Sequence, residues 1–129
     1  MTSKHTLMTK PNCGPFALAK VLDLDVETVE QAYAKANGKG PRWRGRSNAP
    51  GLHRAGKVLG AAINPVPQER KVTLATFIEW HTTPAKRYLV RIGDHWLAIV
   101  RGVVYDQHGQ GDCRFDALRR CRVTHVATI

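Results

Sequence analysis

The spacing of apolar residues changes once along this chain, and the change separates a helical part from a strand-rich part. In four stretches before residue 82, apolar side chains recur every three or four positions, which places them on one face of a helix. Asn12, Asp25 and Thr73 stand just before three of these stretches and are residue types that favour a helix N-cap. The predicted helices cover residues 14–23, 26–36, 50–60 and 74–81.

After Pro84 the apolar runs become short and rich in β-branched residues, which is typical of strands. The dipeptides Gly93-Asp94 and Arg101-Gly102 separate three of these runs and favour two-residue hairpin turns. Helices followed by an antiparallel sheet define an α+β fold class, and a length of 129 residues favours a single domain over residues 1–129. The predicted strands cover residues 87–92, 95–100, 103–106 and 121–129, with a short extended piece over 62–66.

The composition agrees with a folded chain, since 43% of the residues are hydrophobic and 23% are charged. The net charge of +10 is concentrated between residues 35 and 71, where nine basic residues accompany a single acid, Glu69. Such a field attracts nucleic acid, other polyanions or an acidic protein partner, and a solvated basic face is the third interpretation. Trp43 adds a ring on which a base could stack. The candidate binding residues are Arg42, Trp43, Arg44, Arg46, Arg54 and Lys57.

The three cysteines are odd in number and lack zinc-ligand spacing, so we expect free thiols, no metal and no cofactor. Free thiols favour a reducing compartment. The first residues lack the apolar centre of a signal peptide, and no run of 18 apolar residues indicates a membrane span. We therefore expect a cytoplasmic protein that does not engage a membrane.

Cys13 stands where the first predicted helix begins, in the sequence Asn12-Cys13-Gly14-Pro15. The reactive form of cysteine is the thiolate, and a helix N-terminus lowers a thiol pKa because its dipole and unpaired N–H groups favour the anion. The same N–H groups can donate to the oxyanion of an acyl transfer. Cys13 is therefore a candidate nucleophile, and the alternative is a buried cysteine that begins a helix without any chemistry.

His95 and Asp106 are brought together by the second predicted hairpin. A two-residue turn at 101–102 pairs Leu97 with Asp106, and side chains two apart on a strand share a face. His95 and Asp106 then lie diagonally across the hairpin, within reach of each other. A carboxylate in that position fixes the tautomer of an imidazole and stabilises its cation. The alternative is a polar strand edge with an ordinary histidine.

Two segments carry a family resemblance. Residues Asn12–Leu18 resemble the nucleophile helix of papain-like cysteine peptidases, above all the small bacterial and phage-type members and the bacteriocin-leader peptidases. The segment Tyr88–Val100, followed by Gly102–Asp106, is similar to the hairpin that carries their histidine and aspartate. The resemblance implies a papain-like fold, with N-terminal helices packed on a C-terminal antiparallel sheet. For a phage-encoded member it also implies a location in the host cytoplasm or the virion.

By this resemblance the chain would be a cysteine hydrolase that acts by acyl transfer. Cys13 would be the nucleophile, His95 the general base and acid, and Asp106 the residue that orients His95. Trp96 and Gly14 would line the substrate cleft. The substrate would be a peptide or protein amide, an isopeptide or a side-chain amide.

The oxyanion hole would consist of the backbone N–H of Cys13 and a nearby amide. The family usually places a glutamine about six residues before the cysteine, whereas position 7 of this chain is Leu7. Asn12, or His5 from the first segment, would have to take its place. This departure leaves a second hypothesis open, a weakly active or inactive papain-like module that docks a polyanion or an acidic protein through its basic region.

Overall fold

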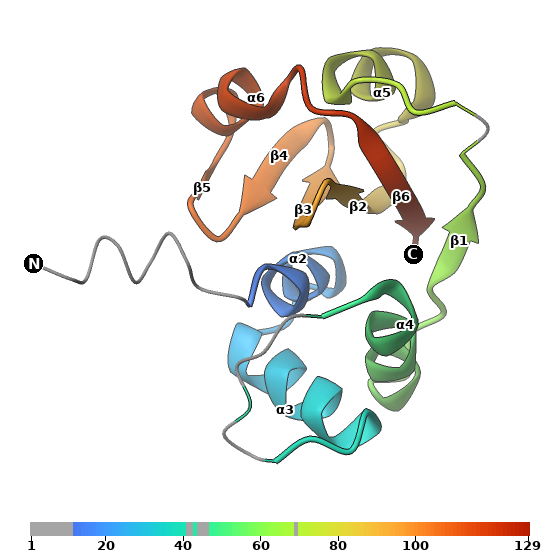
Figure 1. Ribbon diagram of the computed structural model, residues 1–129, viewed down its shortest axis with the longest axis vertical. Coiled ribbons are helices and arrows are strands. Elements are labelled where there is room, and N and C mark those ends of the chain that lie inside the picture. Colours follow the sequence, from blue (N-terminus) through green and yellow to red (C-terminus); the bar gives the residue numbers. More distant parts are fainter. Residues whose placement is uncertain (1–11, 41–42, 44–46, 69) are drawn as a thin grey trace, which may run out of the picture.

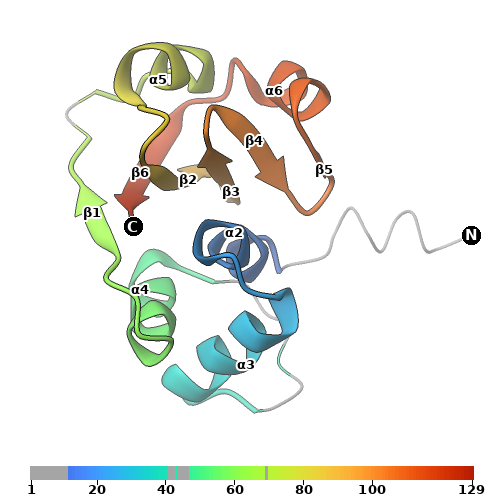
Figure 2. The same cartoon turned by 180° about the vertical axis from the view of Figure 1, so that it is seen from behind.

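The computed structural model describes residues 12–40, 43, 47–68 and 70–129, and within them it has an α+β architecture. A six-stranded antiparallel sheet lies between two groups of helices, one group below it and one above it in Figure 1, and Figure 2 shows the same layers from behind. The helices are α2 (Cys13–Leu22), α3 (Val26–Ala36), α4 (Ala49–Val58), α5 (Leu74–His81) and α6 (Asp112–Leu118). The strands are β1 (Asn64–Val66), β2 (Arg87–Ile92), β3 (His95–Val100), β4 (Val103–Asp106), β5 (Gly109–Gln110) and β6 (Val123–Thr128).

The strand order is β1-β6-β2-β3-β4-β5. Strands β2, β3 and β4 follow each other through tight turns, and the pairs Ile92–His95 and Val100–Val103 close the two hairpins as predicted. The last strand, β6, lies between β1 and β2, so the end of the chain is built into the sheet. The register of a hairpin is fixed by the type and length of its turn, which is why the sequence predicts it.

The sheet separates two apolar cores because both of its faces are covered. On β3, Trp96 and Ala98 point into a core shared with α2, α3 and α4. Their neighbours Leu97 and Ile99 point into a second core, which includes Phe77 of α5. Strand β3 therefore reads as a continuous apolar run, with both faces buried.

Polar N-caps explain where three helices begin. The Asp25 side chain accepts a hydrogen bond from the Thr28 backbone (3.1 Å), and Thr73 accepts one from the Thr76 backbone (3.3 Å), as expected from the sequence. Asn48 caps α4 through the backbone N–H of Gly51 at 2.8 Å, so this helix begins one residue earlier than predicted. Asn12 occupies the N-cap position of α2, but its side chain makes no capping hydrogen bond.

Strand β5 and helix α6 were not expected, because residues 107–120 resemble a glycine-rich loop. Helix α6 has seven residues, none of them buried, so it lacks the wide apolar stripe that identifies a helix from sequence. Gly111, with φ of 77°, makes the turn into it, and only Phe115 and Leu118 pack against the second core. None of the helices in the described part of the chain has the length and apolar character required to span a bilayer.

Helices α3 and α4 approach each other closely at Gly51. A Cβ atom at this position would lie 2.8 Å from Cε2 of Tyr33 and closer still to its hydroxyl. We expect Gly51→Ala to destabilise the fold by about 1–3 kcal/mol, because the rings and helices must shift to admit the methyl group. Gly40→Ala is the matched control, since no atom outside its chain neighbours lies within 4 Å of its added Cβ.

Urea unfolding of the two variants and the unsubstituted chain measures this difference directly. Equal free energies of unfolding for Gly51→Ala and Gly40→Ala would show that α3 and α4 do not pack as closely as the structure indicates.

Candidate active site

Cys13 is the first residue of α2, the helix that packs most directly on β3. Its thiol is half-buried, with Sγ 4.0 Å from the carbonyl oxygen of Asp94 in the turn before β3. Helix α2 is held there by its apolar face, since Ala17, Leu18 and Val21 are buried in the first core. Cys13 is thus placed beside the turn that begins the His95 strand, although Asp94 in that turn is 81 positions away in the sequence.

Burial raises the pKa of the Cys13 thiol, but the hydrogen bond to the His95 side chain and its positive charge outweigh burial and lower the pKa below its ordinary value. Backbone hydrogen bonds from Trp96 and Gly14 act in the same direction. The backbone of Trp96 and Gly14 and the side chain of His95 therefore all favour the thiolate form of Cys13. This is the environment of a reactive cysteine.

His95 and Asp106 lie together as the hairpin predicts. Nε2 of His95 is 2.8 Å from Oδ2 of Asp106, and the Asp106 side chain is fully buried. Since Asp106 occupies Nε2, the nitrogen left to meet Cys13 is Nδ1. The structure thus brings Cys13, His95 and Asp106 into one chain of contacts.

The opposite charges of His95 and Asp106 stabilise each other. Burial lowers the pKa of His95, but the hydrogen bonds with Asp106 and Cys13 raise it to about 9. Burial also raises the pKa of Asp106, and the opposing hydrogen bonds from His95 and Arg114 lower it to about 2. At neutral pH these directions favour an imidazolium between a thiolate and a carboxylate.

Two residues of this site were not identified from the sequence. Arg114 of α6 donates to both oxygens of Asp106, with Nε 2.9 Å from Oδ1 and Nη2 2.7 Å from Oδ2. The backbone N–H of His108 donates to Oδ1 at 2.9 Å, and the His108 ring stacks on His95 with centroids 6.0 Å apart. The sequence carries a weak signal for His108, two positions after the aspartate, and none for Arg114.

Asn12 is turned toward α3. Its side-chain Nδ2 donates to Oε2 of Glu30 at 3.2 Å, and both residues are buried. One of its two amide hydrogens is therefore committed to holding the start of α2 against α3. The oxyanion role of Asn12 stays a prediction for the other hydrogen, and Leu7 and His5 lie outside the described residues.

Trp96, expected in the substrate cleft, lines a hollow of about 480 Å³ between α4 and the sheet. The side chain is 3% exposed, and its Nε1 has no hydrogen-bond partner. Gly14 does not line this hollow, because it is buried beneath Ser47, whose Cβ would lie 2.9 Å from an added Cβ. The lining residues are Ala49, Pro50, His53, Arg54, Pro65, Leu89, Trp96, His125, Val126 and Ala127.

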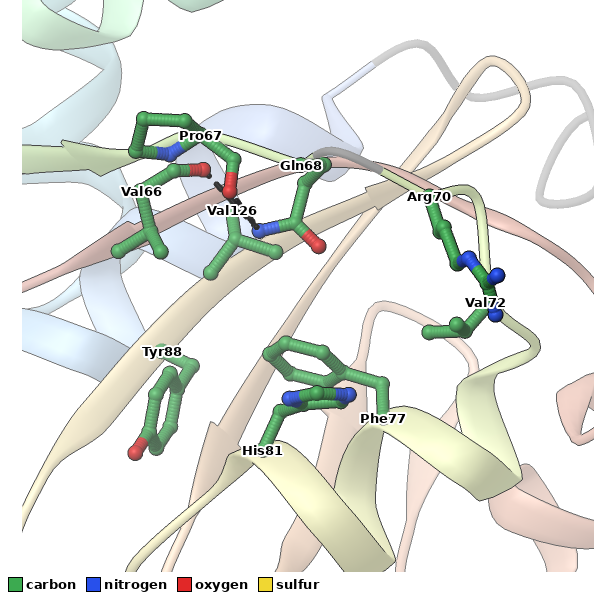
Figure 3. Close-up of a pocket in the computed structure, with 9 residues that line it drawn as sticks. All are labelled: Val66, Pro67, Gln68, Arg70, Val72, Phe77, His81, Tyr88 and Val126. Atoms are coloured by element: carbon green, nitrogen blue, oxygen red, sulfur yellow. Dashed lines mark hydrogen bonds between the residues drawn. The ribbon is translucent and has the colours of Figure 1, made fainter.

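A separate hollow of about 350 Å³ lies near α5 (Figure 3). Phe77, His81 and Tyr88 form one wall, and across from them Gln68 donates from Nε2 to the carbonyl oxygen of Val66 at 3.1 Å. Its lining includes none of the three candidate catalytic residues, Cys13, His95 and Asp106. It is therefore a feature apart from the candidate active site.

The predicted basic binding set is only partly described, because Arg42, Arg44 and Arg46 lie outside the described residues. Trp43 stacks on Tyr33 with ring centroids 4.4 Å apart, so that face of the indole packs internally and is not available to a base. Nε of Arg54 donates to Asn37 at 2.7 Å, and Lys57 is exposed.

The fold also creates a hollow lined by basic residues from two separate segments, which the sequence did not indicate. Thr73 and Arg122 form a β-bridge, which places residues 70–71 beside residue 122. The resulting hollow, about 630 Å³, is lined by Arg70, Lys71 and Arg122. Positive charge therefore gathers at the beginning of α5 as well as in the region that the sequence indicated.

The described residues contain no group of three His, Cys, Asp or Glu side chains placed to hold a metal ion. All three cysteines are free, with Cys113 and Cys121 exposed. Comparisons of this chain with protein-family models, curated proteins and solved structures found no match.

Proposed function

We propose that this protein is a papain-like cysteine hydrolase that cleaves amide bonds by acyl transfer through Cys13, His95 and Asp106. Two interactions of His95 support the proposal: its Nε2 lies 2.8 Å from Oδ2 of Asp106, and its side chain hydrogen-bonds to the Cys13 thiol. A nucleophile, a base and an orienting acid in this order are the three parts that covalent acyl transfer requires.

The reaction begins from the ion pair in which the proton of the Cys13 thiol already resides on Nδ1 of His95. The thiolate attacks the carbonyl carbon of the amide, and N–H groups at the start of α2 donate to the oxyanion. His95 then gives its proton to the leaving amine, and the carbon–nitrogen bond breaks to leave a thioester. Water, deprotonated by His95, releases the acid and restores the Cys13 thiol. Asp106 holds the imidazole and stabilises its cation throughout.

The hollow beside Trp96 supports a peptide substrate with an apolar side chain near the scissile bond. The backbone of Trp96 hydrogen-bonds to Cys13, and its side chain lines the hollow, so the two sites share one residue. Leu89, Val126 and Ala127 make the floor apolar. Apolar hollows with few polar groups are typical of side-chain subsites.

The proposal is tested by alkylating the protein with iodoacetamide from pH 5 to pH 9 and following each cysteine by peptide mass spectrometry. Because the pKa of Cys13 is lowered, we expect it to react at pH 6 about tenfold faster than Cys121, which is exposed. The variant His95→Ala should remove most of that advantage. Equal rates for the two cysteines, together with no effect of His95→Ala, would rule out an activated thiol.

A further inference from the structure

The Asp106 carboxylate is buried, yet each of its oxygens receives at least two hydrogen bonds. Oδ2 meets Nε2 of His95 at 2.8 Å and Nη2 of Arg114 at 2.7 Å. Oδ1 accepts from the backbone N–H of His108 and from Nε of Arg114, each at 2.9 Å. Arg114 thus bonds to both oxygens at once, and its planar fork fixes the plane of the carboxylate.

Removing Arg114 would change the charge or the orientation of the Asp106 carboxylate that His95 contacts. A buried carboxylate without its cation either rotates toward other donors or becomes protonated, because desolvation penalises its charge. Either change weakens the hydrogen bond from His95 Nε2, the contact that sets the imidazole for Cys13. Arg114 therefore acts on the Cys13 thiol indirectly, through the side chains of Asp106 and His95.

Helix α6 is short, but its position is well defined. The backbone N–H of Arg114 donates to the carbonyl of Gly111 at 3.1 Å, and that of Gly111 donates to Val104 of β4 at 2.8 Å. Phe115 and Leu118 anchor the helix on the second core. The guanidinium is itself mostly covered, with 19% of the side chain exposed. An ion pair between solvated side chains would contribute little, whereas this one is enclosed.

We infer that Arg114 is a positioning residue of the candidate active site, which holds Asp106 ionised and oriented so that His95 can activate Cys13. The catalytic consequence of this inference depends on the proposed function. Its structural content, the control of the His95–Asp106 hydrogen bond by Arg114, does not.

The test compares Arg114→Met, which keeps the length of the side chain without its charge, with Arg114→Lys and with Arg120→Met. Arg120 lies in the exposed turn after α6 and serves as the control for loss of one positive charge. The first readout is the rate of Cys13 alkylation by iodoacetamide at pH 6, with Cys121 as the internal reference. The second is the hydrogen-bonded Nε2 proton of His95 in the proton NMR spectrum.

We expect Arg114→Met to slow Cys13 alkylation roughly tenfold, Arg114→Lys to slow it less, and Arg120→Met to leave it unchanged. In Arg114→Ala, which leaves the space of the arginine side chain empty, ethylguanidinium should restore much of the rate, whereas ethylammonium should not. The His95 Nε2 proton signal should weaken in Arg114→Met, weaken less in Arg114→Lys and stay unchanged in Arg120→Met. A purely structural contribution of Arg114 would not be rescued by ethylguanidinium.

Wild-type alkylation and an unchanged Nε2 proton in folded Arg114→Met would overturn the inference. If that variant does not fold, Arg114→Lys decides, because a wild-type rate and Nε2 proton there would exclude a need for the fork. Failure of the proposed function is a different result, in which Cys13 of the unsubstituted protein reacts no faster than Cys121. The Nε2 proton still tests the role of Arg114 in that case.

Discussion

We expect Cys13→Ala to abolish the proposed amide hydrolysis, with a loss of about 10⁴-fold or more, because the thiol that hydrogen-bonds to His95 is removed. Cys113 and Cys121 are both exposed, and the Cys113 thiol donates to the carbonyl oxygen of Gln110, so we expect neither to replace Cys13. The alanine side chain fits the half-buried position without a new clash, so folding should be retained.

The assay uses a pool of fluorogenic peptide amides that vary the residues around the scissile bond, including apolar residues that suit the hollow beside Trp96. Cys113→Ala is the matched control, and it should hydrolyse the same members of the pool at the unsubstituted rate. Hydrolysis that persists in Cys13→Ala but disappears in Cys113→Ala would place the chemistry at a different thiol.

Asp106→Asn should lower the proposed hydrolysis by up to about 10⁴-fold, the loss seen when the orienting acid of a catalytic triad becomes an amide. Without the carboxylate, the buried imidazole loses the hydrogen bond that raises its pKa to about 9. His95 is then neutral at pH values where it is now charged, and it no longer stabilises the thiolate of Cys13. Arg114 would face a neutral amide and oppose the cation further.

The pH profile of Cys13 alkylation measures this change. In the unsubstituted protein the lowered pKa of Cys13 gives an alkylation rate that is already high at pH 6. In Asp106→Asn the pKa of Cys13 should rise, so the pH at which alkylation becomes fast should rise with it. Asp116→Asn is the control, because it removes one carboxylate from an exposed position of α6. An acid limb that is identical in Asp106→Asn and the unsubstituted protein would show that Asp106 does not act on the thiol through His95.

Asp106 is the electrostatic centre of this arrangement, because it joins His95 of the sheet to Arg114 of α6. Its pKa of about 2 means that it stays ionised across the whole range in which His95 titrates. In the proposed reaction, His95 would therefore exchange protons with Cys13 and a leaving group without transferring one to the carboxylate. Asp106 would orient and stabilise the base and take no proton from it.

The placement of His95 against Asp106 could be predicted from the sequence because it depends on local geometry. Two residues in the 101–102 turn fix the register of β3 and β4, and the register fixes which side chains share a face. The caps of α3 and α5 are predictable for a similar reason, since each is a contact between residues three positions apart. Turn length and side-chain chemistry over a few residues suffice for these features.

The sequence by itself thus determined the α+β order, the central hairpins, and the identities of Cys13, His95 and Asp106 as candidates. Only the tertiary structure decided which contacts bring these three side chains together and hold them in place. Cys13 meets His95 because α2 packs on β3 across 82 positions of chain, and Arg114 reaches Asp106 through a helix with no buried residue. Such contacts depend on the burial of whole elements against each other, which local spacing does not encode.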